Sequence, residues 1–467
     1  MKSPYVCSAI LALSVAATAM PAGRTRDSRV TPFPAIPGLV SSDVYAVTVN
    51  GVPVWTEKFR THFDVSKFPE WFIEPKTRVQ QEIHQASFSC EDGVEIAIRV
   101  AHPIGHAAVR PLSRKIETLV SGGTLTFSIP GPEYLVVEID SLPPLFLFAC
   151  SPEWEKLTPS DPGVHYFGPG VHRPGYITMK EGETVYLAPG ALVYGGIRAR
   201  GVGHIRVTGR GILDGAAEFS QMVLVENSHD VQFDGVMIRN GDGWTNTIVN
   251  CDSVEYSDVR VLSFGPAGDG IDPLNSRHVA ITGCFLRCTD DCIAVKAPQR
   301  GRNVDDILIS SNTMLGYAFS DGATIGFETN ADSITNVVIS DCDVLQARGG
   351  SRVEGHSGFS IICDGPAVIS NVAFVENRVE NAEEKLFELN VTDGTKYGTG
   401  PPGHIQNILV RDVSWSRARP IIIRGFDGAH RVSNVIFDGC TVEGKPLRTV
   451  REGVMQIGQF AGGVVIR

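Results

Sequence analysis

The chain has few basic residues for its length, and this shortage argues against a nucleic-acid partner. Its 467 residues include 41 Lys and Arg against 52 Asp and Glu, which gives a formal net charge of −11. Proteins that neutralise phosphates need clustered Lys and Arg. We therefore expect no nucleic-acid partner. A polyanionic substrate is also disfavoured unless the binding cleft is locally basic.

Signatures of cofactor and metal binding are missing as well. No P-loop, flavin or dinucleotide motif occurs, and the Gly-rich segments lie at predicted turns. Ten cysteines are present, but none forms a Cys-x-x-Cys pair. No suitably spaced His accompanies Cys284, Cys288 and Cys292, so the sequence predicts neither a cofactor nor a metal site. Cys90 and Cys150 are candidates for a disulfide within the N-terminal region.

Long apolar runs are absent beyond the N-terminus, so no membrane-spanning segment is predicted. The apolar residues 9–17 are too few to cross a bilayer. Lys2 precedes them and the small-residue pattern Ala17-Thr18-Ala19 follows, as in a cleaved signal peptide. The sequence therefore predicts a signal peptide over residues 1–22 and a secreted, extracellular protein.

Residues 35–160 have the pattern of a β-sandwich. The chain is rich in turn-forming residues, with 49 Gly and 28 Pro, which favours many turns over long helices. Apolar and polar residues alternate in several short stretches that Gly and Pro clusters separate. Many short strands of this kind are typical of a sandwich. The clearest of these stretches are residues 44–50, 94–100, 124–129 and 134–139.

From residue 165 onward one segment type recurs nine times. Each copy has alternating apolar residues, a small polar corner and a second apolar pair. The copies start at His204, Asp230, Ser253, His278, Asp306, Asn336, Asn371, Asn407 and Asn434. Such a repeat without a helical period predicts a right-handed parallel β-helix over residues 165–467. A β-propeller is the alternative, but its blades are longer and its hairpin turn signals are weak here.

Two details of the repeat carry further expectations. The steps that follow Asn336 and Asn371 are the longest, which predicts inserted loops that wall one side of a cleft. Cys284, Cys342 and Cys440 each occupy the seventh position of their copy. These three cysteines are therefore expected to be stacked core thiols rather than metal ligands. A single-chain β-helix buries its core without a partner, so we expect a monomer.

Three aspartates mark the candidate active site. Asp269 lies in the segment GDGIDP, and Asp290 and Asp291 lie in TDDCIAVK. The 21 residues from Asp269 to Asp290 are close to one coil, so these carboxyls can converge on neighbouring rungs about 4.8 Å apart. Crowded carboxylates raise one another's pKa, which provides a general acid beside an ionised base. Glycoside hydrolysis needs this pair, although corner aspartates also stabilise turns or bind calcium.

The same segments resemble the polygalacturonase family and its sister family of dextranases and isopullulanases. Residues 290–296 (DDCIAVK) match the Asp-Asp segment of these families. Residues 268–272 (GDGID) resemble their Asn-Thr-Asp motif, and residues 209–215 (GRGILDG) an early turn. The resemblance covers about residues 165–450. It implies an inverting glycoside hydrolase in which Asp290 is the general acid and Asp269 and Asp291 hold and activate the water.

The departures from this family pattern bear on the substrate. Asp321 stands where polygalacturonases carry the histidine of a Gly-His-Gly motif. Residues 360–362 (SII) stand where they carry Arg-Ile-Lys, which binds the substrate carboxylate. A galacturonate would then lack its charged partners. We therefore expect a neutral, α-glucan-like substrate, and the preceding sandwich resembles the layout of the dextranase and isopullulanase family.

Five further residues are candidates for substrate binding because of their positions beside the aspartates. They are Trp244 on the preceding rung, Asp272 and Lys296 on the same rungs, and Asp321 and Glu328 on the following rung. Three alternatives stay open at this point: a polygalacturonase acting on pectin, a polysaccharide lyase, and a non-catalytic carbohydrate-binding protein.

Overall fold

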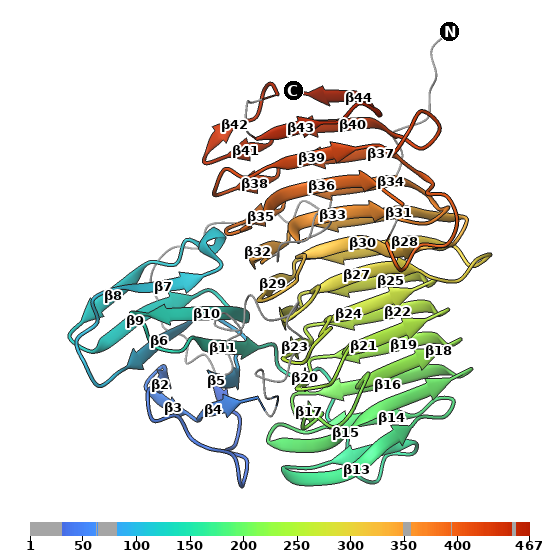
Figure 1. Cartoon of the computed structure of the whole chain (residues 1–467). Helices are drawn as coiled ribbons and strands as arrows, with labels where there is room; N and C mark the ends of the chain where they lie inside the picture. The colour runs from blue at the N-terminus through green and yellow to red at the C-terminus, as the bar shows by residue number, and fades with distance from the viewer. Residues whose placement is uncertain (1–29, 62, 64–81, 349–355, 394, 451–453) are drawn as a thin grey trace.

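The computed structural model describes residues 30–61, 63, 82–348, 356–393, 395–450 and 454–467. The predicted signal peptide therefore lies outside the described residues. In Figure 1 the N-terminal strands, blue to teal, lie against one flank of a tall stack of coils that runs from green to red. The predicted class, a right-handed parallel β-helix preceded by a β-sandwich, is confirmed.

The N-terminal part consists of two facing sheets. The six-stranded sheet has the order β1-β5-β11-β10-β7 with β4 beside β5, and the five-stranded sheet has the order β3-β2-β6-β9-β8. The strands are β1 (Thr31–Pro32), β2 (Ala46–Val49), β3 (Val52–Val54), β4 (Thr56–Arg60), β5 (Glu82–Ser89), β6 (Val94–Arg99), β7 (Ala107–Arg110), β8 (Thr118–Ser121), β9 (Thr124–Ile129), β10 (Glu133–Ile139) and β11 (Leu145–Cys150). One cluster that includes Ile96, Leu125 and Leu147 fills the space between the sheets.

Strand β11 differs from its neighbours because both of its faces are buried. Most strands of the sandwich alternate, as in β6, where buried and more exposed residues take turns. In β11 all six residues are buried. Leu147 points into the sandwich core, whereas Phe146 and Phe148 pack against residues of the β-helix such as Phe285. The sandwich is therefore anchored to the β-helix through the second face of this strand.

The β-helix has one long sheet and two stacks of shorter strands. The long sheet contains β12 (Val164–Phe167), β14 (Thr184–Leu187), β16 (Gly203–Gly209), β19 (His229–Asp234), β22 (Asp252–Ser257), β25 (Arg277–Thr282), β28 (Val304–Ser310), β31 (Ser333–Ser340), β34 (Val368–Val375), β37 (His404–Arg411), β40 (Val432–Asp438) and β44 (Ala461–Ile466). Neighbouring strands in this sheet pair in parallel.

The remaining strands of the β-helix pair in parallel in two ladders, which start from the long strands β13 (Gly170–Thr178) and β15 (Ala191–Arg200). The first contains β17 (Ile212–Asp214), β20 (Met237–Arg239), β23 (Arg260–Leu262), β26 (Phe285–Cys288), β29 (Thr313–Gly316), β32 (Asp343–Gln346), β35 (Arg378–Val379), β38 (Ser414–Trp415) and β41 (Thr441–Val442). The second contains β18 (Val223–Glu226), β21 (Asn246–Val249), β24 (Ile271–Leu274), β27 (Ile293–Ala297), β30 (Ala323–Thr329), β33 (Ser357–Cys363), β36 (Lys385–Val391), β39 (Ile421–Arg424) and β43 (Met455–Ile457). A short strand β42 (Lys445–Pro446) pairs antiparallel with β41.

A left-handed residue marks the start of each of the nine predicted copies. The first residues of all nine copies have φ between 49° and 59°. Asn and Asp tolerate this conformation better than most residues, and the last four copies all start with Asn. The side-chain amide of Asn371 donates to Asn336, that of Asn407 to Asn371, and that of Asn434 to Asn407. The first residues of the nine copies therefore occupy equivalent positions in successive coils.

The described cysteines are buried and free. Cys284, Cys342 and Cys440 lie in the main core of the β-helix, as the repeat predicted. The suggested disulfide between Cys90 and Cys150 is not formed in the structure. Both thiols are instead buried in the apolar interior of the N-terminal part, where burial raises the pKa of Cys90 to about 11.

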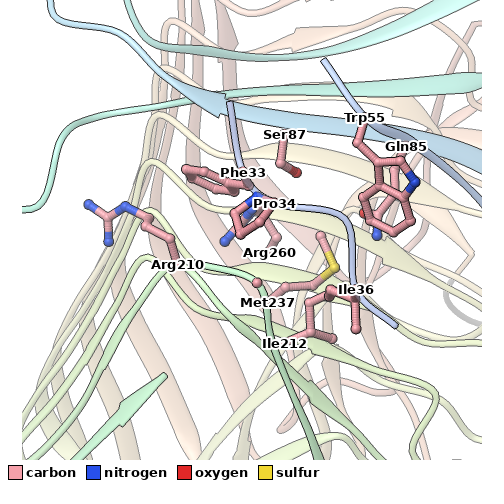
Figure 2. A pocket seen from close by; sticks show the side chains of 11 residues that line it. Phe33, Pro34, Ile36, Trp55, Gln85, Ser87, Arg210, Ile212, Met237 and Arg260 are labelled. Carbon is pink, nitrogen blue, oxygen red and sulfur yellow. The ribbon is translucent and has the colours of Figure 1, made fainter. Parts of the chain in front are cut away.

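A buried ion cluster joins the two parts. Arg239 of β20 binds Glu57 of β4 through two nitrogens at 2.9 and 3.0 Å and Asp214 of β17 at 2.6 Å. Its guanidinium also lies over the ring of Phe59 at 4.2 Å. Figure 2 shows the adjoining seam, where Pro34 and neighbouring residues face the coil that carries Met237. The cavity there is about 30 Å³, room for about one or two waters.

Candidate active site

Three candidate aspartates stack on one another because each lies at the same distance along the chain before a strand, and these strands pair in register. Ile271 of β24 pairs with Ile293 of β27, and Ile293 pairs with Ala323 of β30. Asp269, Asp291 and Asp321 each lie two residues before one of these partners. Backbone hydrogen bonds from Gly270 to the Asp291 carbonyl (2.9 Å) and from Cys292 to the Asp321 carbonyl (3.1 Å) continue the ladder through this segment. Three carboxyls therefore occupy one column, a rung apart.

The column continues by one residue in each direction. Asn246 pairs with Ile271, which puts Trp244 one rung before Asp269. Ala323 pairs with Phe359, which puts Ser357 one rung after Asp321. The order Trp244, Asp269, Asp291, Asp321 and Ser357 brings an aromatic ring, three acids and a hydroxyl together from five coils.

Hydrogen bonds fix the upper half of this column. The carboxylate of Asp291 accepts the backbone N–H of Asp321 at 2.7 Å. Asp321 in turn accepts from the backbone and hydroxyl of Ser357 at 2.6 and 2.8 Å and from the backbone of His356 at 3.0 Å. Both oxygens of Asp321 are thus engaged by the next coil. The backbone of Asp321 therefore positions Asp291, and its carboxylate positions the segment of His356 and Ser357.

Lys296 links the lower half of the site. Its Nζ lies 3.1 Å from the carboxylate of Glu328 and 3.8 Å from that of Asp269. The same ammonium lies 4.8 Å from the centre of the Trp244 ring. Burial lowers the pKa of Lys296, but the carboxylates of Glu328 and Asp269 outweigh it and hold the pKa above its ordinary value. This lysine is therefore a permanent cation among acids.

A cavity of about 270 Å³ opens over these residues. All three predicted catalytic aspartates line it, as do four of the five predicted substrate-binding residues. Its lining consists of Trp244, Ala267, Asp269, Asp290, Asp291, Lys296, Phe319, Asp321, Phe327, Glu328, His356 and Tyr397. Acids and aromatic rings together match the needs of a sugar site, since rings pack against the apolar faces of sugars and acids bond their hydroxyls.

Burial and crowding raise the pKa of the stacked acids. Asp269 and Asp291 have a pKa well above the ordinary range, first because they are buried and then because neighbouring carboxylates repel their charge. Lys296 opposes the shift at both. Asp290 is more exposed to the cavity than either, and its Oδ1 accepts the backbone N–H of Asp291 at 3.1 Å. Asp269 and Asp291 therefore hold a proton to higher pH than a free aspartate does.

Asp272 is the predicted substrate-binding residue that does not line the cavity. Its side chain has no exposed surface, and its partner Thr247 on the preceding rung is also buried. Strand alternation turns it away from the core residue Ile271, but the surrounding residues cover that face. Burial, reinforced by Glu328 and Asp290 and opposed by Lys296, raises the pKa of Asp272 to about 8.

This buried acid predicts how stability depends on pH. An unfolded Asp releases its proton near pH 3.9, whereas folded Asp272 keeps it until about pH 8. Its contribution to stability is therefore present in full below about pH 3.9 and is lost progressively as the pH rises from there to about 8. The melting temperature should fall between about pH 4 and 8, and it should fall less in Asp272→Asn. Asp306→Asn, an exposed left-handed position that suits Asn, is the control, and equal slopes for all three proteins would refute the expectation.

The sequence did not single out His356, Tyr397, Phe319 and Phe327, which complete the cavity. The two long steps of the repeat were the available signal for these residues. The loop after β36 carries Tyr397 to the cavity, as expected, whereas residues 349–355 of the loop before β33 lie outside the described residues. Asn330 holds the loop after β36, bonding the carbonyl of Tyr397 at 3.1 Å and the backbone of Thr399 at 2.7 Å.

Comparisons with known proteins agree with this architecture. Dex49A from Penicillium minioluteum has the same fold, with a TM-score of 0.59 at 16% identity over 94% of this chain and 96% of that one. Exopolygalacturonase B of Aspergillus niger is 25% identical over 41% of this chain and 45% of its own. A polygalacturonase of Saccharomyces cerevisiae is 23% identical over 39% of this chain and 49% of its own. The chain thus spans less than half the length of the curated relatives that it matches.

The family model of the glycosyl hydrolases family 28 matches residues 194–454, the coils that carry the aspartate column and its cavity. Since this match covers more than half of the sequence, the chain belongs to the glycosyl hydrolases family 28.

Proposed function

We propose that the protein is an inverting glycoside hydrolase that cleaves a neutral polysaccharide, with Asp269, Asp290 and Asp291 as its catalytic residues. The observation that carries the proposal is the convergence of these acids with one lysine and four aromatic rings in a single cavity. Glycoside hydrolysis by inversion needs one carboxylic acid and one carboxylate that face the bond from opposite sides.

The surroundings of each acid suggest its role. Asp290 is the most exposed of the three to the cavity, where it donates a proton to the glycosidic oxygen as the bond to the leaving sugar breaks. Asp269, 3.8 Å from the cation of Lys296, is the carboxylate that takes a proton from the attacking water. Asp291 is fixed by the backbone of Asp321 and orients that water.

The charge of the cavity favours a neutral sugar. Five carboxyl groups line it, those of Asp269, Asp290, Asp291, Asp321 and Glu328, against one lysine. Lys296 already pairs with Glu328 and Asp269, so a uronate carboxylate would be desolvated among like charges. The hydroxyls of a neutral sugar would instead find carboxylate acceptors.

Pectin is the second candidate, and the names of the curated relatives favour it. The imidazole of His356 lines the cavity one rung beyond Asp321, and it would be the group there that binds a galacturonate carboxylate.

Reducing-sugar release from dextran, pullulan, arabinan, galactan and polygalacturonate separates these functions. We expect turnover of a neutral polymer, abolished in Asp290→Asn, with inverted configuration at the new reducing end by proton NMR. Turnover of polygalacturonate alone would refute the neutral substrate. An ultraviolet-absorbing unsaturated product would indicate a lyase, and binding without turnover a carbohydrate-binding protein.

The site of action follows from the N-terminus. We infer that residues 1–22 direct secretion and that the enzyme acts as an extracellular monomer. Within the described part of the chain, no helix is long and apolar enough to span a membrane. Finding the mature N-terminus near residue 20 in culture medium would support export, and an intracellular protein with Met1 retained would refute it.

A further inference from the structure

Three residues outside the active site bring metal-binding atoms together on the long sheet. Glu181, His204 and His229 each offer one ligand atom, and these atoms lie within 4.8 Å of one another. All three side chains are exposed, and within the described residues no other such group of three is found. We propose that this cluster binds Zn²⁺ with two imidazoles and one carboxylate, leaving the fourth position to water.

The donor set and spacing suit zinc. Two His and one Glu are a ligand set that Zn²⁺ takes in tetrahedral sites, whereas Ca²⁺ and Mg²⁺ prefer sites built from oxygen. Zinc ligands about 2.0–2.1 Å from the ion stand about 3.3 Å apart. To reach this spacing from the present one, the ligand atoms must move by about 1 Å. Exposed side chains can do this by small rotations about their side-chain bonds.

Secondary contacts hold two of the ligands in place. Nδ1 of His204 lies 2.5 Å from a carboxylate oxygen of Asp230. A carboxylate only accepts, so this contact requires the hydrogen on Nδ1, and in the neutral imidazole the lone pair is then on Nε2. A metal-binding His typically donates its other N–H to a carboxylate in this way. The carboxylate of Glu181 accepts the backbone N–H of Gly203.

A glycine makes the close approach possible. Gly203 of β16 pairs with His229 of β19, and the His229 ring lies directly over it. A Cβ at residue 203 would stand 2.4 Å from Nε2 of His229. The rings of His204 and His229 meet edge to face with centroids 5.4 Å apart. The two histidines thus come from strands that pair with each other, β16 and β19, and Glu181 comes from the turn before β14.

The site is separate from hydrolysis. Its ligands belong to the coils of β14, β16 and β19, whereas the aspartates belong to those of β24, β27 and β30. Zinc would therefore cross-link neighbouring coils near the start of the β-helix and stabilise the folded state by binding to it. Its removal should lower the melting temperature without changing turnover.

Calorimetric titration of untagged, chelator-treated full-length protein with Zn²⁺ tests the proposal. We expect one saturable site at micromolar Zn²⁺ and a rise in melting temperature. His229→Ala should abolish both, and Asp230→Asn should weaken binding about tenfold through the orientation of His204. His278→Ala is the matched control, because His278 is exposed and also bonds a carboxylate, that of Asp252 at 2.8 Å.

Two outcomes would overturn the site. Absence of saturable binding by the wild-type protein would do so, as would equal affinity in wild type and in His204→Ala/His229→Ala. Gly203→Ala provides a check that leaves every ligand in the sequence, since its methyl group should displace His229 and weaken binding. Hydrolysis measured on the same samples separates this result from the proposed function, because each can fail while the other holds.

Discussion

Asp290→Asn is expected to lower kcat on a polysaccharide by about 100- to 10,000-fold, the range that general acid–base groups contribute. Asn has nearly the same shape but cannot donate a carboxylic proton to the departing oxygen. The substitution should leave the fold intact because Asp290 borders the cavity and is partly exposed. Melting temperature and substrate affinity should stay close to wild type, which places the loss in the chemical step.

The leaving group distinguishes the proposed acid from the proposed base. In an aryl glycoside with an acidic phenol, the phenolate leaves without being protonated. Asp290→Asn should therefore lose much less activity on such a substrate than on the polysaccharide. Asp269→Asn should lose activity on both substrates, because attack by water is needed in each case. Equal losses for the two variants on both substrates would contradict the assignment of roles.

Arg239→Ala is expected to reduce the free energy of unfolding by about 3–5 kcal/mol, the usual cost of removing one partner from a buried ion pair. Glu57 and Asp214 would be left as buried carboxylates, each only 1% exposed. The contact of the guanidinium with Phe59 would also be lost. Because Glu57 belongs to the sandwich and Asp214 to the β-helix, the substitution should loosen the attachment between the parts.

Thermal unfolding and limited proteolysis check this expectation. Arg239→Ala should melt at a lower temperature and be cut between the two parts sooner than wild type. Arg173→Ala is the control, since Arg173 also lies over an aromatic ring, that of Tyr194 at 4.1 Å, but is exposed. A change below about 1 kcal/mol in Arg239→Ala would show that the cluster does not hold the parts together.

The sequence by itself determined the coil repeat, the two-part β architecture and the aspartate column. These features depend on local rules. A residue that adopts left-handed φ recurs once per coil, as at Asn336 and Asn371. Strand alternation sets which side chains face inward. The spacing of Asp269 and Asp291 equals one coil, so parallel pairing alone aligns them.

Only the tertiary structure decided which residues the loops and the sandwich bring to these coils. Tyr397 reaches the cavity through an insertion that is held by a distant partner, Asn330. The covering of Asp272 depends on packing that strand alternation does not specify. The Glu181 cluster depends on the turn before β14, which places Glu181 beside two histidines of the following coils. Periodicity fixes the register between neighbouring coils, whereas loop closure and packing between parts involve contacts that no repeat encodes.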